Sequence, residues 1–232
     1  MLPNGSDSPD PNDDLRSNET EIDAPELASD SDTSTVIPTP FCEGMAEIPE
    51  AYEERALLNN LIRAKGIDSL DSLSPKARHI KQGLALTVGS ALGETPPTVQ
   101  QCFEAFTQPN RNHLTAGARA WSKHAHRSEK MDEGSRTIPG WWGSPKGPVA
   151  IINERAIELF WRVMKATTWR NLHWLPHTIL VYEARVQEGY GLRWSQDRSL
   201  ADSADEADKR PWLFRGFVEP MMEGGHEAGW RH

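Results

Sequence analysis

The 232-residue sequence predicts an α+β domain in which helices pack on a small, mainly antiparallel sheet. Apolar residues recur at helical spacing up to about residue 167, and between residues 178 and 220 the spacing changes to the two-residue alternation of strands. All nine Trp follow residue 78. Each can bury roughly 150 to 250 Å², so we expect the main core in the second half of the chain.

An acidic, Ser- and Pro-rich segment precedes this domain. Residues 1–50 contain 13 Asp and Glu against one basic residue, Arg16, so the net charge of −9 divides into about −12 there and about +3 in the remainder. Such a composition buries too little apolar surface to offset chain entropy. We therefore expect a disordered acidic tail at residues 1–48, available to a protein partner.

Residues 49–109 are expected to form short helices that pack on the main domain. Apolar residues lie at helical spacing in 49–66, 74–92 and 95–108. Ser74 is the expected N-cap of the second helix, with Pro75 in its first turn, although Gly83 and Gly89 weaken the helical pattern after it.

The α+β core domain is expected at residues 110–232. It begins with a helix over 113–128 that carries Arg119, Lys123 and Arg127 at intervals of four, so that either protein carboxylates or an anionic ligand should lie nearby. A longer amphipathic helix follows over 148–167. Between them stands Trp141–Trp142, interpreted as a plug over the core or, alternatively, as a stacking surface.

Strands are predicted over 178–186, 192–195 and 212–220. In the first, Leu180, Tyr182, Ala184 and Val186 share one face, and Ile179, Val181, Glu183 and Arg185 share the other. Arg193 and Arg215 fall on the returning strands. Three guanidinium groups would then meet one carboxylate, which favours an anion site unless Asp197 or Glu219 balances the charge.

The stretch "WRNLHWLPH", residues 169–177, is interpreted as a loop leading into the first strand. His173 and His177 have the four-residue spacing of helical metal ligands, but Pro176 disfavours a helix there, and a third ligand such as Glu183 or His226 is not indicated by the spacing. We therefore predict no metal site.

The leading hypothesis is a pocket for an anionic, phosphate- or carboxylate-bearing small molecule, with acid–base chemistry by His173 or His177 together with Glu183. The helix with Lys123, His124 and Arg127 is expected to close the other side of the pocket. The ligand-binding residues are predicted to be Lys123, Arg127, Asn171, Arg185, Arg193, Arg215 and Trp194.

Two other functions remain open: a non-enzymatic adaptor that uses exposed Trp and the acidic tail, and a protein that binds single-stranded nucleic acid. Nucleic acid is judged an unlikely partner, because the body carries a charge of only about +3. No phosphate-binding Gly motif or nucleophile elbow is present, and no cofactor is indicated. Two Cys and no run of 18 apolar residues predict a soluble, cytoplasmic or nuclear protein without disulfides.

Overall fold

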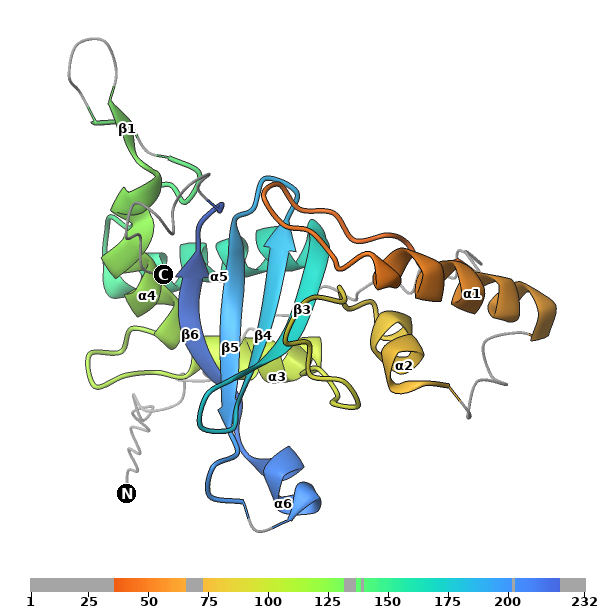
Figure 1. Cartoon of the computed structure of the whole chain (residues 1–232). Coiled ribbons are helices and arrows are strands. Elements are labelled where there is room, and N and C mark those ends of the chain that lie inside the picture. Colours follow the sequence, from red (N-terminus) through yellow and green to blue (C-terminus); the bar gives the residue numbers. More distant parts are fainter. Residues whose placement is uncertain (1–35, 66–72, 132–136, 139, 202, 222–232) are drawn as a thin grey trace, which may run out of the picture. The chain divides into compact units, whose positions relative to one another are not determined.

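A computed structural model describes residues 36–65, 73–131, 137–138, 140–201 and 203–221 (Figure 1). The described residues belong to one compact unit within Ser34–His232. Most of the predicted acidic tail, up to residue 35, lies outside the described residues, as does His226. None of the described helices combines the length and the apolar character that crossing a membrane requires.

A four-stranded antiparallel sheet forms the centre of the domain, which confirms the predicted fold class. Its strands lie in the order β3 (Thr167–Leu175), β4 (Ile179–Val186), β5 (Gly191–Asp197) and β6 (Leu213–Val218). Each strand follows its neighbour in sequence, so every connection in the sheet is a hairpin or a short excursion.

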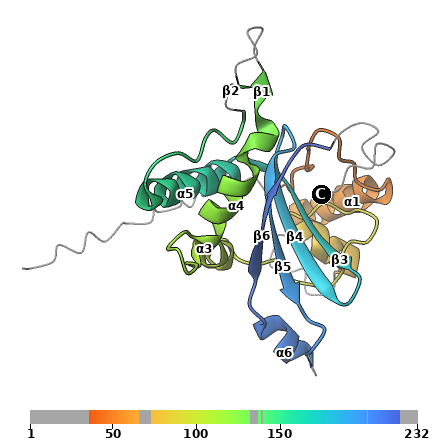
Figure 2. The same cartoon turned by 90° about the vertical axis from the view of Figure 1, so that its left-hand side faces the viewer.

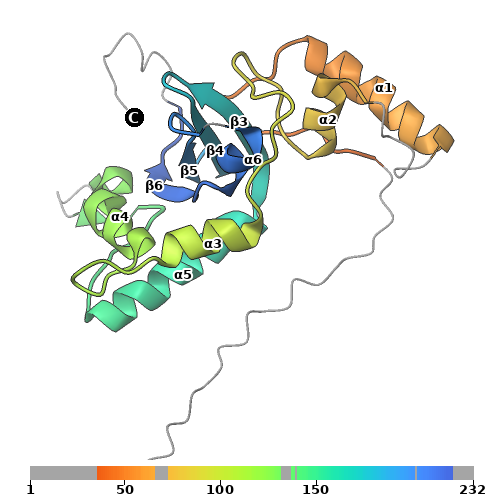
Figure 3. The same cartoon turned by 90° about the horizontal axis from the view of Figure 1, so that it is seen from below.

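Apart from the short helix at 204–209, which the sequence pattern does not predict, the helices lie where the apolar periodicity predicts them. They are α1 (Glu50–Lys65), α2 (Pro75–Lys81), α3 (Val99–Thr107), α4 (Ala116–His124) with the 3-10 helix η2 (Ala125–Ser128), α5 (Val149–Lys165) and α6 (Ala204–Lys209). Helices α3 and α5 cover one face of the sheet (Figure 3), and α4 lies beside β6 (Figure 2). A two-stranded ribbon, β1 (Lys130–Met131) with β2 (Thr137–Ile138), follows η2.

Polar side chains cap the helices that begin after loops. Ser74 accepts a hydrogen bond from the Ala77 amide, as predicted, and Thr98 and Thr115 cap α3 and α4 in the same way. The helix predicted over 74–92 is shorter than expected, because Gly83 adopts a φ of 73° and ends it.

An aromatic cluster fills the space between helices and sheet. Leu180, Tyr182, Ala184 and Val186 all belong to this core, which confirms their predicted common face. Phe106, Phe160, Trp142 and Trp194 are also buried in the core. Trp142 is 1% exposed and its carbonyl accepts a hydrogen bond from the Trp121 indole, so the Trp pair serves as a plug over the core. An adaptor that uses this pair as an exposed surface is therefore disfavoured.

The segment 169–175 is a strand and not a loop, so this sequence-based interpretation is wrong. Its residues pair with β4 throughout, and only Pro176, His177 and Thr178 form the turn. His177 and Thr178 have φ values of 65° and 58°, the left-handed conformation that a tight reversal requires. The alternation is hidden because polar and aromatic side chains occupy both faces of β3.

Helices α1 and α2 pack on a second apolar cluster, with Leu58, Ile62, Ile80 and Leu86 at its centre. A buried ion pair joins this part to the preceding segment. Arg55 donates to both carboxylate oxygens of Glu47 at 2.8 and 2.7 Å, and the Leu86 amide donates to the same carboxylate at 2.8 Å.

Replacing Arg55 with Ala should lower the free energy of unfolding by about 3 to 5 kcal/mol, because Glu47 would remain buried without its guanidinium partner. Urea unfolding measures this loss. The exposed Arg63 of the same helix supplies the control, and Arg63→Ala should change the stability by about 0.5 kcal/mol or less. Equal effects of the two substitutions would contradict a structural role for the buried pair.

Candidate active site

The face of the sheet opposite α3 and α5, here called the outer face, carries the charged residues predicted from the alternation. Glu183 and Arg185 lie on it from β4, and Arg193 lies beside them from β5, directly opposite Glu183 in the register. Glu183 forms ion pairs with both guanidinium groups, at 3.0 Å from the Arg185 Nε and in direct contact with Arg193. One carboxylate therefore joins two strands through two cations.

Arg185 is a structural member of this group. It is 1% exposed, and its Nη1 donates to the carbonyl oxygens of Gly189 at 2.7 Å and Glu219 at 2.9 Å. Because its Nε is bound to Glu183, protein groups take up much of its donor capacity. The structure thus places Arg185 beneath the surface, where it supports the site and does not reach a ligand directly.

Arg193 differs, because 27% of its side chain is exposed. Burial alone would raise the pKa of Glu183, but Arg185, Arg193 and His173 together hold this pKa below its usual value. Glu183 is therefore a fixed carboxylate at neutral pH and a poor proton donor. It orients the Arg193 guanidinium instead.

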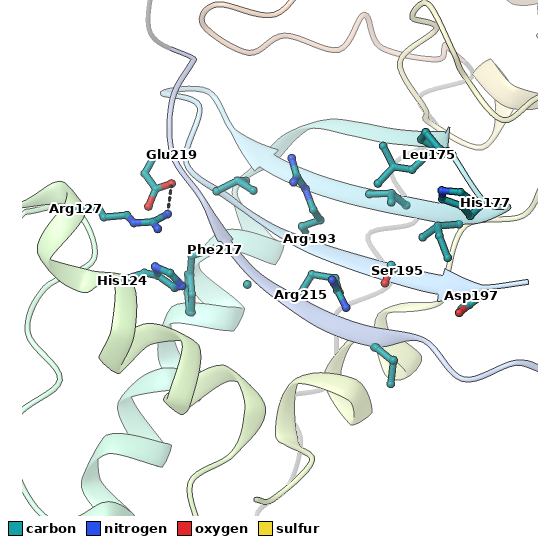
Figure 4. Close-up of a pocket in the computed structure, with 16 residues that line it drawn as sticks. His124, Arg127, Leu175, His177, Arg193, Ser195, Asp197, Arg215, Phe217 and Glu219 are labelled. Carbon is teal, nitrogen blue, oxygen red and sulfur yellow. Dashed lines mark ion pairs between the residues drawn. The ribbon is translucent and has the colours of Figure 1, made fainter. Parts of the chain in front are cut away.

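A pocket of about 750 Å³ lies above this group on the outer face (Figure 4). Strands β4, β5 and β6 form its floor, the β3–β4 turn closes one end, and α4 with η2 closes the other. The charged and histidine residues that line it are His124, Arg127, His177, Arg193, Asp197, Arg215 and Glu219.

The pocket contains more fixed positive than negative charge. Arg215 forms no ion pair with any described residue, and Arg127 is 3.8 Å from the Glu219 carboxylate. Asp197 lies at the far end, where hydrogen bonds from Ser199 lower its pKa. Arg193 and Arg215 therefore face the middle of the pocket (Figure 4), between Asp197 at one end and Glu219 at the other.

Two groups with shifted pKa values line the pocket, His124 from α4 and Glu219 from the segment after β6. Burial first, and then the neighbouring Arg127, His126 and Lys123, lower the pKa of His124, so its imidazole is neutral at pH 7. Burial raises the pKa of Glu219 despite Arg127 nearby. The His124 Nδ1 and the Glu219 Oε1 are both buried without a hydrogen-bond partner among the described residues.

The two pocket histidines lie at opposite ends. His124 stands beside Phe217 in Figure 4, and Phe217 is level with Leu192 and Ala184 in the register. His177 follows the other end of that floor, beyond Ile179. Five residues of strand separate these levels, which corresponds to about 17 Å. A single small group therefore contacts one histidine or the other.

The predicted site residues separate into three sets. His177, Arg127, Arg193 and Arg215 line the pocket, and Asn171, His173, Glu183 and Arg185 lie beside it on the same sheet face. The His173 ring is partly buried, its Nδ1 is 3.4 Å from the Asn171 amide nitrogen, and burial lowers its pKa. Lys123 is exposed on α4 outside the pocket.

Trp194 must be removed from the predicted ligand-binding set. Its side chain points into the helix-covered core, is fully buried, and donates through Nε1 to the Cys102 carbonyl. It directly follows Arg193 in the strand and so occupies the opposite face. The same alternation reveals Ser195, which lines the pocket two residues after Arg193 and was not predicted.

No group of three or more His, Cys, Asp or Glu side chains in the described part of the chain is arranged to hold a metal ion. The site is defined by guanidinium and imidazole groups over an antiparallel sheet. Guanidinium groups bind phosphate or carboxylate oxygens through paired hydrogen bonds, so the arrangement is suited to an anionic ligand.

Residues 104–202 match the family model of the CdiA C-terminal tRNase toxin domain. The match begins in α3 and ends after β5, so it includes His124, Arg127, His177 and Arg193 but not β6. Similarity to a tRNase domain overturns the expectation that nucleic acid is an unlikely partner, because such a domain takes tRNA as its substrate. No curated protein and no solved structure shows a significant match.

The lowered pKa of Glu183 predicts a pH-dependent contribution to stability. Its carboxylate stabilises the fold fully above the ordinary Glu pKa of about 4.3, and this contribution is lost as the pH falls through the lower folded-state value. Glu183→Gln should cost about 3 kcal/mol at pH 7, and the difference from the unmodified protein should narrow below pH 4. Urea unfolding between pH 3 and 7 measures it.

The exposed Glu188 provides the matched control for this measurement. Glu188→Gln should follow the stability of the unmodified protein across the whole pH range. A Glu183→Gln difference that stayed constant down to pH 3 would show that the carboxylate charge is not what stabilises the sheet.

Proposed function

We propose that this protein is a ribonuclease that cleaves tRNA, and that the outer-face pocket is its active site. The observation that carries this proposal is a pocket with two guanidiniums on its floor, Arg193 and Arg215, and with His124 and Glu219 among its lining residues. Similarity of residues 104–202 to a tRNase toxin domain supplies the substrate class. The cytoplasm, where tRNA serves translation, is the expected site of action.

Arg193 and Arg215 are proposed to bind the scissile phosphate. Guanidinium groups match the geometry of two phosphate oxygens and stay charged at every accessible pH. Glu183 holds Arg193 in place before the substrate arrives, so little conformational freedom is lost on binding. The negative charge that grows on the phosphoryl oxygens in the transition state is stabilised by the same two cations.

His124 is proposed as the general base and Glu219 as the general acid. A neutral His124 takes the proton from a ribose 2′-hydroxyl, and the 2′-oxygen forms a bond to phosphorus. The bond between phosphorus and the 5′-oxygen breaks, and that oxygen takes its proton from the protonated fraction of Glu219, which burial increases by raising the pKa of this carboxyl group. The products are a 2′,3′-cyclic phosphate and a 5′-hydroxyl end, and both side chains return to their initial states by proton exchange with water.

His177 has a different proposed role, because it lies about 17 Å along the sheet from the His124 end. Together with Leu175, Ile179 and Leu213 it forms a partly apolar pocket end. This end is suited to a neighbouring nucleotide, through ring contacts and one polar group. The acid–base role predicted for His177 from the sequence is thereby replaced by substrate binding.

The histidine roles predict different kinetic effects. His124→Gln should lower kcat for tRNA cleavage by about 100-fold or more, because the general base is removed. His126→Gln, which changes an exposed histidine two residues away and outside the pocket lining, should leave kcat within about twofold. Gel-based cleavage kinetics measure both. An equal loss in the two variants would contradict the role of His124.

His177→Asn should instead raise KM and leave kcat largely unchanged. Asn is chosen because it tolerates the left-handed conformation of residue 177. His113 supplies a matched control, since it is an exposed histidine with a φ of 61°, so His113→Asn makes the same change at the same backbone conformation. A kcat loss in His177→Asn as large as in His124→Gln would move the chemistry to the other end of the pocket.

The proposed chemistry also predicts the outcome with a modified substrate. A tRNA with a 2′-deoxyribose at the cleaved nucleotide lacks the attacking hydroxyl and should bind but remain intact. Mass spectrometry of the products from unmodified tRNA should find the cyclic phosphate. Cleavage of the deoxy-substituted bond at an unchanged rate would show that water is the nucleophile.

A further inference from the structure

The proposed active site accounts for only part of the positive charge on this side of the domain. Residues 105–128 contain no Asp or Glu, although the chain has 34 acidic residues. The basic and histidine residues of this stretch are Arg111, His113, Arg119, Lys123, His124, His126 and Arg127. His124 and Arg127 line the pocket, and the other five do not.

Within this basic stretch, the charges of Arg119 and Lys123 are not explained by the pocket. Both are exposed, and they stand one turn apart on α4, about 6 Å along its axis. Among the described residues neither forms an ion pair, whereas Arg127, four positions further, approaches Glu219. Like charges at this spacing repel one another. Exposed Lys and Arg side chains without carboxylate neighbours are free to contact the phosphates of a polyanion.

The positions of Arg119 and Lys123 on α4 indicate where such an anion would lie on the domain. Helix α4 continues into η2, which carries the pocket residue Arg127, so Arg119 and Lys123 lie on the helix about two turns and one turn, respectively, before the proposed cleavage end. A pocket of about 750 Å³ has the size of a small-ligand site, between roughly 300 and 1,000 Å³. A tRNA is far larger, so most of the substrate must lie outside the pocket.

We propose that α4 is a second RNA-binding surface, on which Arg119 and Lys123 contact backbone phosphates of the substrate beyond the cleaved bond. The proposal rests on the ribonuclease function given above. It explains how a small pocket can favour a structured polynucleotide over short RNA. Binding through phosphates is independent of base sequence, so α4 sets affinity and orientation, and the pocket decides which bond is cleaved.

The test compares two double variants that remove the same charges from different helices. Arg119→Ala/Lys123→Ala removes one Arg and one Lys from α4, and Lys76→Ala/Arg78→Ala removes the same pair from exposed positions on α2. Each pair is introduced into the full chain, and into the full chain with His124→Gln so that tRNA stays intact during binding measurements. Circular dichroism and urea unfolding verify that both fold.

The α4 pair should weaken tRNA binding roughly fivefold to tenfold. It should also reduce the slope of log affinity against log salt by about 1.5, because two phosphate contacts are lost. Cleavage of a short single-stranded RNA that fills only the pocket should stay within about twofold of the unmodified protein. The α2 pair should change none of the three quantities.

Other outcomes overturn the proposal. Unchanged tRNA affinity in the α4 variant would show that this surface meets another partner, such as an acidic protein. An equal loss in the α2 variant would show that only the total charge matters. Failure of the ribonuclease function is distinguished from both, because tRNA and short RNA would then both remain uncleaved by the unmodified protein while the binding comparison still gives its answer.

Discussion

The buried carboxylate of Glu183 is the interaction on which the outer face of the sheet depends. It binds Arg185 on its own strand and Arg193 on the next, and Arg185 continues to the carbonyls of Gly189 and Glu219. Two strands, the turn between them and the chain after β6 are thereby joined through one charged group. An isolated charge at this depth would be costly, so each member is stable only in the presence of the others. The same network therefore positions Glu219 in the pocket wall and Arg193 on the pocket floor.

The separation of core from chemistry follows from the two-residue period of the strands. In β4 and β5, one set of side chains meets the aromatic cluster and the alternate set supplies the charged network and the pocket floor. Trp194 and Arg193 are neighbours in sequence, yet one is in the core and the other faces solvent. The rigidity of the packed face is therefore transmitted directly to the residues that are proposed to bind phosphate.

The fold can be predicted from the sequence where apolar residues recur at one clear spacing, helical or alternating. The site can be predicted only where this spacing places charged residues together on the outer face. Residues 179–186 alternate cleanly, so the sequence pattern alone assigns both faces of β4 correctly. Residues 169–175 do not alternate, because Trp169, Asn171 and His173 mix aromatic and polar character on one face, and the pattern of β3 therefore resembles that of a loop. His124 and Glu219 line the same pocket from chain segments 95 residues apart in sequence, and no local pattern brings them together. The average charge of the body also conceals an acid-free stretch beside the pocket, which is why net charge alone argues wrongly against nucleic acid.

The edge of the sheet at β3 has a consequence for how other molecules can approach. The segment after α2 runs along this strand, where the amides of Ala85 and Ala91 donate to the carbonyls of Arg170 and Leu172, and the Gly89 carbonyl accepts from Trp174. The backbone groups that would otherwise recruit an additional strand are therefore already used. At the opposite edge, α4 packs beside β6. Sheet extension by a second chain is therefore blocked along the stretch of β3 between Arg170 and Trp174, and a large substrate approaches this domain over the outer face and not along that edge.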